Sequence, residues 1–208
     1  MFSLVVASLV AIAPVDVHVA SSVQTAYSTK IRPGVTQTQY GSGTVIKVTD
    51  GKFWVLSCYH IAHSGGDMSG ELIIKTHGKN HSARVLAYDR DFDLSLIECD
   101  GDTDAKPAIL AVEKVKPGET VTKVGYPRAG PRVIASGRVS PVVNTAVGKP
   151  HVVSFVASAP SISGDSGGGV FRSGKLVGVI WGGLPDGLRA TGIEDVRAFL
   201  KKAKFNLD

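Results

Sequence analysis

Short runs of apolar and β-branched residues, separated by turn residues at close spacing, make up most of this 208-residue chain. Runs of this kind are typical of strands, and their number predicts an all-β protein. We expect strands over residues 41–48, 52–57, 71–76, 83–88, 93–98, 120–125, 132–139, 152–156 and 176–180. Only residues 193–202 carry apolar side chains at helical spacing, so one helix is expected to close the chain.

The same pattern divides the chain into two halves. The turn sequence Lys116-Pro117-Gly118-Glu119 interrupts the strand-like runs and is expected to join them. Residues 14–34 are mixed and rich in turn signals, so we expect them to lead into the folded part. The expected units are therefore residues 36–115 and residues 116–203, which together form one domain.

The N-terminal stretch is apolar from Phe2 to Ala13, apart from two serines. It is too short to span a membrane but has the length of a signal-peptide core, and small residues follow around Ala20-Ser21-Ser22. We therefore predict an export signal over residues 1–22 and a secreted or periplasmic protein. The stretch has no lysine or arginine in front of it, so a first strand or a loosely packed arm is the alternative.

Charge and composition narrow the classes of function. The formal net charge is only +5, and the basic residues are scattered, which favours a soluble protein over a nucleic-acid-binding one. Cys58 and Cys99 would either form a disulfide in an exported chain or remain two buried thiols. His63, His77 and His81 have irregular spacing and no accompanying cysteines, so we expect no metal or other cofactor.

The most informative stretch is residues 163–169, where Ser166 follows an aspartate and lies among glycines. Glycines allow a turn that exposes a hydroxyl and aims backbone N–H groups at one point. All six histidines precede Ser166, which excludes the chain order of α/β-hydrolases. Asp16 and Asp50 are poor candidates for a subtilisin order, which leaves the order histidine, aspartate, serine.

Three segments then resemble the motifs of trypsin-fold proteases. Residues 55–60 (VLSCYH) resemble V-L-T-A-A-H, residues 93–97 (DLSLI) resemble D-[IL]-A-L-[LI], and residues 164–168 (GDSGG) resemble G-[DN]-S-G-G. Residues 115–127 and 136–140 are similar to segments of the bacterial HtrA-like branch. The resemblance covers roughly residues 41–200, and the three motifs occur in the right order.

The resemblance implies two six-stranded antiparallel β-barrels of the chymotrypsin type, with the active site between them. Ser166 would be the nucleophile, His60 the general base and Asp93 the residue that orients the histidine. The backbone N–H groups of Gly164 and Ser166 would bind the oxyanion. His63, Asp89 and Asp91 lie outside the motif positions, and we expect them to have no part in the chemistry.

The resemblance also bears on Asp165. In trypsins the equivalent carboxylate pairs with an amine that is created by activation cleavage. Lys30-Ile31 lies too close to Gly41 to supply such an amine, and a buried carboxylate needs a partner. We therefore expect a buried Asp165 paired with Arg138 or, less favourably, with Arg132.

Substrate preference would follow from the walls of the specificity pocket. The resemblance places six residues there: Pro160, Ser161, Val179, Ile180, Trp181 and Gly182. None carries a charge, so a charged substrate side chain would be buried without a partner. We expect small or medium uncharged residues before the cleaved bond, unless Arg189 points inward and favours acidic residues.

The sequence thus predicts a serine endopeptidase that acts on proteins or peptides, without a cofactor, a nucleic-acid partner or a membrane span. A processing protease with one narrow target is an alternative of the same class. A binding or chaperone-like module that has kept the protease fold is the alternative from another class. The oligomeric state stays open.

Overall fold

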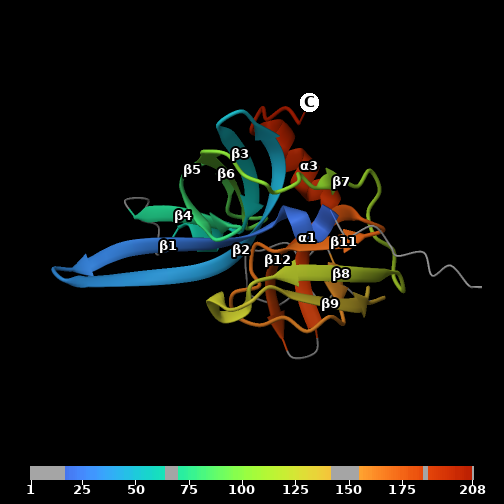
Figure 1. Cartoon of the computed structure of the whole chain (residues 1–208). Coiled ribbons are helices and arrows are strands. Elements are labelled where there is room, and N and C mark those ends of the chain that lie inside the picture. Colours follow the sequence, from blue (N-terminus) through green and yellow to red (C-terminus); the bar gives the residue numbers. More distant parts are fainter. Residues whose placement is uncertain (1–16, 64–69, 142–154, 185–186, 208) are drawn as a thin grey trace, which may run out of the picture.

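The computed structural model describes residues 17–63, 70–141, 155–184 and 187–207. Six strands form a closed antiparallel barrel in the first half of the chain, and the remaining strands form a curled sheet in the second half (Figure 1). The all-β prediction is confirmed.

The barrel has the strand order β1-β2-β3-β6-β5-β4. Its strands are β1 (Ser22–Arg32), β2 (Val35–Thr49), β3 (Lys52–Ser57), β4 (Glu71–Thr76), β5 (Lys79–Asp89) and β6 (Leu94–Asp100). The first two strands pair from Ser22–Thr44 to Arg32–Val35, and this long hairpin extends beyond the rest of the barrel (Figure 1). The hairpin therefore carries a stretch of β2 past the end of the other strands.

The expected start of the first half at residue 36 is wrong, because β1 is a full member of the barrel. Val23, Thr25, Tyr27 and Thr29 alternate with more exposed residues and are all buried. Two of these inward residues are threonines, so the alternation of apolar and polar residues is hidden in the sequence. The stretch that reads as a turn-rich leader is a barrel strand.

The second sheet has the order β10-β13-β12-β11-β8-β9. Its strands are β8 (Thr120–Gly125), β9 (Val133–Arg138), β10 (Phe155–Ala157), β11 (Gly169–Arg172), β12 (Lys175–Leu184) and β13 (Gly187–Gly192). A bridge between Val139 and Ala157 brings the two ends of this order together, so the sheet curls like a barrel. The expected strand over residues 152–154 lies outside the described residues.

The boundary between the halves also differs from the expected residue 116. Strand β7 (Ile109–Leu110) pairs in parallel with β12, and the N–H of Ala111 donates to the carbonyl of Leu176 at 2.8 Å. The second half therefore begins before the turn at Lys116. That turn connects two segments of the same sheet.

Two hydrophobic clusters fill the interior. The smaller one lies inside the first barrel around Phe53 and Ile74, and the larger one runs through the second sheet to α3 (Ile193–Lys202). The predicted helix is confirmed with the same bounds, and it buries Ile193, Val196, Phe199 and Leu200. Its burial on one face follows from its 3.6-residue apolar spacing.

The structure describes only the last residues of the predicted export signal. Residues 1–16 lie outside the described residues, whereas α1 (Val17–Ser21) and the start of β1 belong to the fold. The carbonyl of Ala20 accepts from the N–H of Lys106 at 3.1 Å, and the carbonyl of Val19 accepts from Arg132 Nη1 at 3.0 Å. The export signal over residues 1–22 stays a prediction. In the described part of the chain, no helix has the length and apolar character needed to cross a membrane.

Candidate active site

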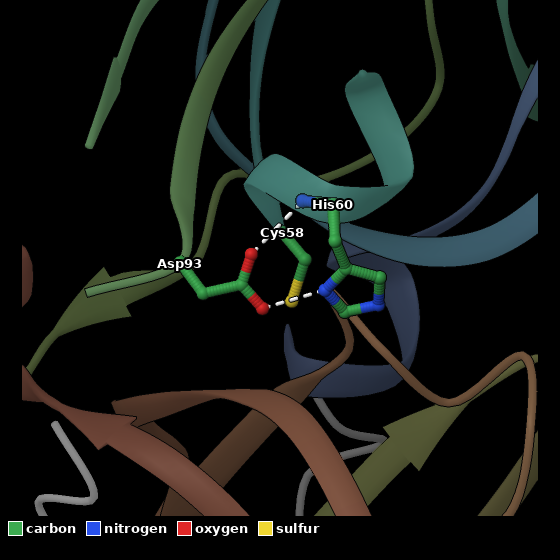
Figure 2. Close-up of side chains that lie close together, drawn as sticks. All are labelled: Cys58, His60 and Asp93. Carbon is green, nitrogen blue, oxygen red and sulfur yellow. Dashed lines mark hydrogen bonds and ion pairs between the residues drawn. The ribbon is translucent and has the colours of Figure 1, made fainter. Parts of the chain in front are cut away.

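His60 and Asp93 are held together by two hydrogen bonds (Figure 2). His60 Nδ1 lies 2.6 Å from Asp93 Oδ2, and the backbone N–H of His60 donates to Asp93 Oδ1 at 2.9 Å. Asp93 is 1% exposed, whereas the histidine side chain is 36% exposed. A buried carboxylate therefore orients a partly exposed imidazole, with Nδ1–H toward Asp93 and Nε2 free to accept a proton.

Local structure explains this arrangement. His60 lies in the short helix α2 (Tyr59–Ala62), directly after β3, and Asp93 directly precedes β6, the neighbour of β3. Asp93 has a φ of 51°, which aspartate tolerates better than most residues. Its carbonyl accepts from the N–H of Tyr59 at 3.2 Å. The aspartate thus satisfies two N–H groups at the helix start as well as the ring.

Cys58 lies next to this pair, and the possible ligand atoms of Cys58, His60 and Asp93 are within 4.8 Å of one another (Figure 2). Burial, followed by the charge of Asp93, raises the pKa of the Cys58 thiol well above its usual value. The thiol donates to the carbonyl of Ile180 at 3.0 Å. Metal binding and nucleophilic attack both need a thiolate, so Cys58 is a protonated packing residue here.

Cys58 and Cys99 are both free and buried, which settles the disulfide alternative against a bridge. Cys99 lies on β6 inside the first barrel, and burial raises the pKa of its thiol as well. Both side chains act as small apolar residues of the core.

Ser166 follows a tight turn over residues 162–165, in which the N–H of Asp165 donates to the carbonyl of Ile162 at 3.1 Å. Gly164, the third residue of this turn, has a φ of 97°, as a type II turn requires. A Cβ at Gly164 would lie 2.5 Å from the nitrogen of Arg128 and 2.7 Å from the carbonyl oxygen of Tyr126. Only glycine fits this position.

This turn leaves two donors available beside the serine. Within the described residues, the N–H groups of Gly164 and Ser166 donate to no backbone acceptor. Ser166 Oγ itself donates to the carbonyl of Trp181 at 3.4 Å, a long hydrogen bond that a rotation of the side chain would break. The site therefore has the donor pair that an oxyanion needs.

Ser42 on β2 connects the first barrel to this turn. Its N–H donates to the carbonyl of Ser166 and its Oγ donates to the carbonyl of Gly164, both at 2.7 Å. The same Oγ accepts from the N–H of Tyr126 at 2.8 Å, and Ser57 Oγ donates to the carbonyl of Ser42 at 2.7 Å. One buried serine thus fixes the serine turn relative to the strand that leads to His60.

His60 and Ser166 line the same open cleft of about 390 Å³. The other lining residues come from the extended part of β2, from α2, from the turn, and from the short helix η1 (Pro127–Ala129): Gln37, Thr38, Gln39, Tyr40, Ile61, Arg128, Ser163 and Gly164. The cleft lies between the barrel and the sheet, and each contributes one of the two reactive side chains. The structure thus brings all three predicted triad residues to one region.

Asp165 is fully buried, as predicted, but its predicted partners are wrong. It pairs with Lys123 Nζ on β8, which is also buried. Arg138 Nη1 instead donates to the carbonyl of Gly118, and Arg132 Nη1 to that of Val19, each at 3.0 Å. Both arginines are exposed, whereas Lys123 alternates inward with Val121 on β8.

The residues of the predicted specificity pocket lie in two groups around the turn. Val179 and Ile180 are fully buried, whereas Trp181 is half-buried and Gly182 has open space where a Cβ would lie. Pro160 is exposed, and the buried Ser161 packs against the backbone of Gly183. Arg189 lies opposite Gly182, on the face away from the buried Leu188 and Ala190.

The rival residues have structural roles. His63 stacks on Tyr59 and meets the edge of Tyr88, and burial lowers the pKa of its imidazole. Asp89 Oδ1 accepts from the N–H groups of Asp91 and Phe92, so it stabilises the turn before β6. Sequence reasoning missed Ser42, Lys123 and Arg128. The inward alternation of Lys123 with Val121 was the one available signal, because a buried lysine needs a carboxylate.

A closed barrel and a curled sheet, with a histidine–aspartate pair on one and a glycine-bounded serine on the other, define a chymotrypsin-type hydrolase fold. The model of the trypsin-like peptidase domain family matches residues 41–179, and the chain belongs to this family.

Characterised relatives come from the HtrA type. The chain is 26% identical over 156 residues to the periplasmic pH-dependent serine endoprotease DegQ of Escherichia coli. It is also 26% identical over 153 residues to the serine protease Do-like HtrA of Bacillus subtilis. These matches cover 74% and 69% of this chain but 33% of each relative, so the chain spans about a third of their length.

Solved structures show the same fold. The active form of the Rv3671c protease from Mycobacterium tuberculosis has a TM-score of 0.72 at 23% identity, covering 90% of this chain and 82% of that one. The HtrA-type protease AlgW with a decapeptide has a TM-score of 0.70 at 15% identity, covering 89% and 64%.

Proposed function

We propose that this chain is a serine endopeptidase in which His60, Asp93 and Ser166 form a catalytic triad. The observation that carries the proposal is the buried Asp93 hydrogen-bonded to the Nδ1 of His60 at 2.6 Å, with Ser166 on the same cleft. A triad needs this tautomer, because only then can Nε2 take the proton of the serine.

The first half of the reaction would begin with rotation of Ser166 Oγ from the carbonyl of Trp181 toward His60 Nε2. The hydroxyl oxygen attacks the carbonyl carbon of the peptide bond while its proton passes to Nε2. The negative charge then develops on the former carbonyl oxygen, where the N–H groups of Gly164 and Ser166 bind it. The C–N bond breaks, the imidazolium gives its proton to the leaving amine, and an acyl-enzyme remains.

The second half would repeat these steps with water. His60 takes a proton from the water as the hydroxide oxygen attacks the ester carbon. The bond to Ser166 Oγ breaks, and the imidazolium returns the proton to the serine. Asp93 accepts the hydrogen bond of His60 Nδ1 and stabilises the imidazolium in both halves.

The free edge of β2 suits the peptide on the leaving-group side. The N–H and carbonyl of Ser42 both bond away from β1, toward Ser166 and Ser57. In an antiparallel pair this direction recurs at every second residue, so Tyr40 and Thr38 present their backbone groups to the same side. Both line the cleft, and an extended peptide would add to this edge as a strand.

The nucleophile is tested by Ser166→Ala. We expect peptidase activity to fall to background while the melting temperature changes little, because a half-buried hydroxyl with one long hydrogen bond is lost. A fluorophosphonate probe should label wild type at Ser166, as located by mass spectrometry, and should not label the variant. Casein cleavage by the variant at a rate near wild type would show that the nucleophile is another residue.

Low turnover with normal labelling at Ser166 would instead favour a narrow-target processing protease. An unlabelled, folded wild type would favour the binding or chaperone-like alternative. The same purified protein and probe thus separate the three functions.

For substrate preference, we propose small or medium uncharged residues before the cleaved bond, as the uncharged walls of the predicted pocket suggest. A peptide-library profile should therefore be dominated by Ala, Val or Leu. Arg189→Gln should leave that profile unchanged, since an uncharged substrate residue gains nothing from the arginine. A profile led by Asp or Glu in wild type and lost in this variant would overturn the preference.

We also propose that the protein acts outside the cytoplasm. The apolar N-terminal stretch supports export, and one relative is named as periplasmic.

A further inference from the structure

Lys123 and Asp165 form an ion pair in the interior of the second sheet. The side chain of Lys123 is 3% exposed and that of Asp165 is 0% exposed, so neither charge has bulk water as an alternative partner. Buried charges remain ionised only when they are paired, and the loss of one partner leaves the other charge unpaired. The pair therefore behaves as one unit.

Asp165 is also the residue between the two oxyanion donors, Gly164 and Ser166. Its Oδ2 accepts from the N–H of Ile162 at 3.0 Å, its own N–H donates to the carbonyl of Ile162 at 3.1 Å, and its carbonyl accepts from the N–H of Gly168 at 2.9 Å. The charged carboxylate thus closes the turn that fixes the peptide plane before Gly164. A displaced carboxylate would release that turn.

The residues around Lys123 and Asp165 leave space for this ion pair. Lys123 lies on β8 between Val121 and Gly125 on the inward face, opposite Val170 of β11. A Cβ at Gly125 would lie 2.5 Å from Asp165 Oδ1, so the glycine leaves the space that the carboxylate occupies. Among the described residues, Asp165 Oδ1 has no hydrogen-bond partner, and Asp165 Oδ2 accepts from both Lys123 Nζ and the N–H of Ile162.

We propose that Lys123 is a positioning residue that holds the Gly164–Ser166 turn in its oxyanion-binding conformation through Asp165. The cation comes from a side chain inside the sheet, so the turn needs no free α-amino group and no activation cleavage. This inference rests on the proposed peptidase function, because it assigns a role in binding the oxyanion of that reaction.

The test compares Lys123→Met with the double variant Lys123→Met/Asp165→Asn, which has no unpaired charge. Lys75→Met, at an exposed position on β4, is the control for the same chemical change. Each purified full-length chain is assayed for kcat and KM on a peptide substrate, for the rate of fluorophosphonate labelling and for the melting temperature.

We expect Lys123→Met to lower kcat by about 100-fold, the effect of losing one oxyanion donor, with KM within about threefold of wild type. Labelling should slow in parallel. The double variant should recover at least about a tenth of the wild-type kcat, because the neutral amide can keep the bond from Ile162. A role in folding alone would lower the melting temperature without this split between kcat and KM.

A folded Lys123→Met with wild-type kcat, or with a change in KM alone, would overturn the proposal. If that variant does not fold, a folded double variant as inactive as Ser166→Ala would overturn it. A measurement on wild type is independent of both: chains with a blocked and a free α-amino group should have equal kcat, and a large loss on blocking would contradict the role of Lys123.

The two proposals fail separately. A wild type that is not labelled at Ser166 and cleaves no peptide removes the proposed function. A labelled and active wild type whose folded Lys123→Met variant has the same kcat removes only the role of the lysine.

Discussion

At the scale of single residues, the candidate site depends on backbone groups more than on side chains. Ser42 bonds the carbonyls of Gly164 and Ser166, Asp93 bonds the N–H of His60, and the free N–H groups of the turn face no competing acceptor within the described chain. Sequence motifs identify the candidate reactive side chains. The orientation of the peptide groups around them depends on backbone conformations such as the positive φ of Gly164.

Gly164→Ala tests that orientation directly. A Cβ would collide with the backbone at Tyr126 and Arg128, and a φ of 97° is strained for alanine. We expect the peptide plane to turn and kcat to fall about 10²–10³-fold with little change in KM, as measured by steady-state kinetics.

Gly34→Ala is the matched control. Gly34 has a similar φ of 77° at the tip of the β1–β2 hairpin, but nothing lies within 4 Å of its missing Cβ. This variant should lose some stability and keep its kcat. Equal kinetic losses in the two variants would show that backbone strain, rather than the position of the oxyanion donor, causes the effect.

At the scale of elements, one charge cluster joins three strands of the barrel. Glu98 on β6 accepts from Lys52 Nζ of β3 at 2.8 Å and from Arg84 Nη2 of β5 at 2.7 Å. These contacts hold the pKa of Glu98 below its usual value of 4.5, and the hydrogen bond from Lys52 has the largest effect. A lowered pKa in the folded state means that the ionised form stabilises the fold.

Glu98→Gln should therefore destabilise the protein at neutral pH, by about 1 kcal/mol, since both cationic partners are partly exposed and screened. The stabilisation from Glu98 is fully present when the pH is above the pKa that Glu98 has in the unfolded chain. It is lost as the pH falls through the lower pKa that Glu98 has in the folded protein. Denaturant unfolding should show a difference from wild type that is constant above about pH 5 and shrinks below about pH 4. Glu71→Gln, at the exposed start of β4, is the control, and a difference that grows toward low pH would contradict the assignment.

The elements also show what the sequence could predict. Strands β3, β4 and β8 and the helix α3 have the predicted bounds, because their inward residues are apolar or their spacing is helical. Strand β1 was missed because it turns threonines inward, and β11 and β13 were missed because glycines at their ends look like turns. The residues of the proposed triad could be named from motifs. Lys123 and Ser42 could not, because their contacts join residues 42 and 122 positions apart in the chain.

At the scale of the whole molecule, the C-terminal segment ties the two halves together. Helix α3 packs on the second sheet, and the residues after it return to the first barrel. There the ring of Phe205 lies 5.8 Å from that of Trp54, and Lys47 Nζ donates to the carbonyl of Asn206 at 2.8 Å. These contacts and the hydrogen bonds of Ser42 both connect the second half of the chain to the first barrel.

Phe205→Ala should lower the free energy of unfolding by about 1–2 kcal/mol, less than the ~3–5 kcal/mol of a fully buried phenylalanine, because this ring is half-buried. The value of kcat should stay near wild type when measured well below the melting temperature. Leu207→Ala, a partly exposed neighbour, is the control. An equal loss in the two variants would show that the ring contributes nothing specific.

The hydrogen bond from Ser42 to Gly164 also has a consequence for the order of folding. It joins residues 122 positions apart, whereas hairpins such as β2–β3 and β4–β5 close over short loops. Contacts between residues far apart in the chain form slowly, because closing the long loop between them costs conformational entropy before the contact is made. The barrel pairings β1–β4 and β3–β6 join residues closer in the sequence than this bond does, so we expect the contact that holds the serine turn to be among the later ones to form. If the proposed activity is correct, a chain in which this contact has not yet formed would hold His60 and Asp93 without the turn that presents Ser166, and so would be inactive toward its own unfolded copies.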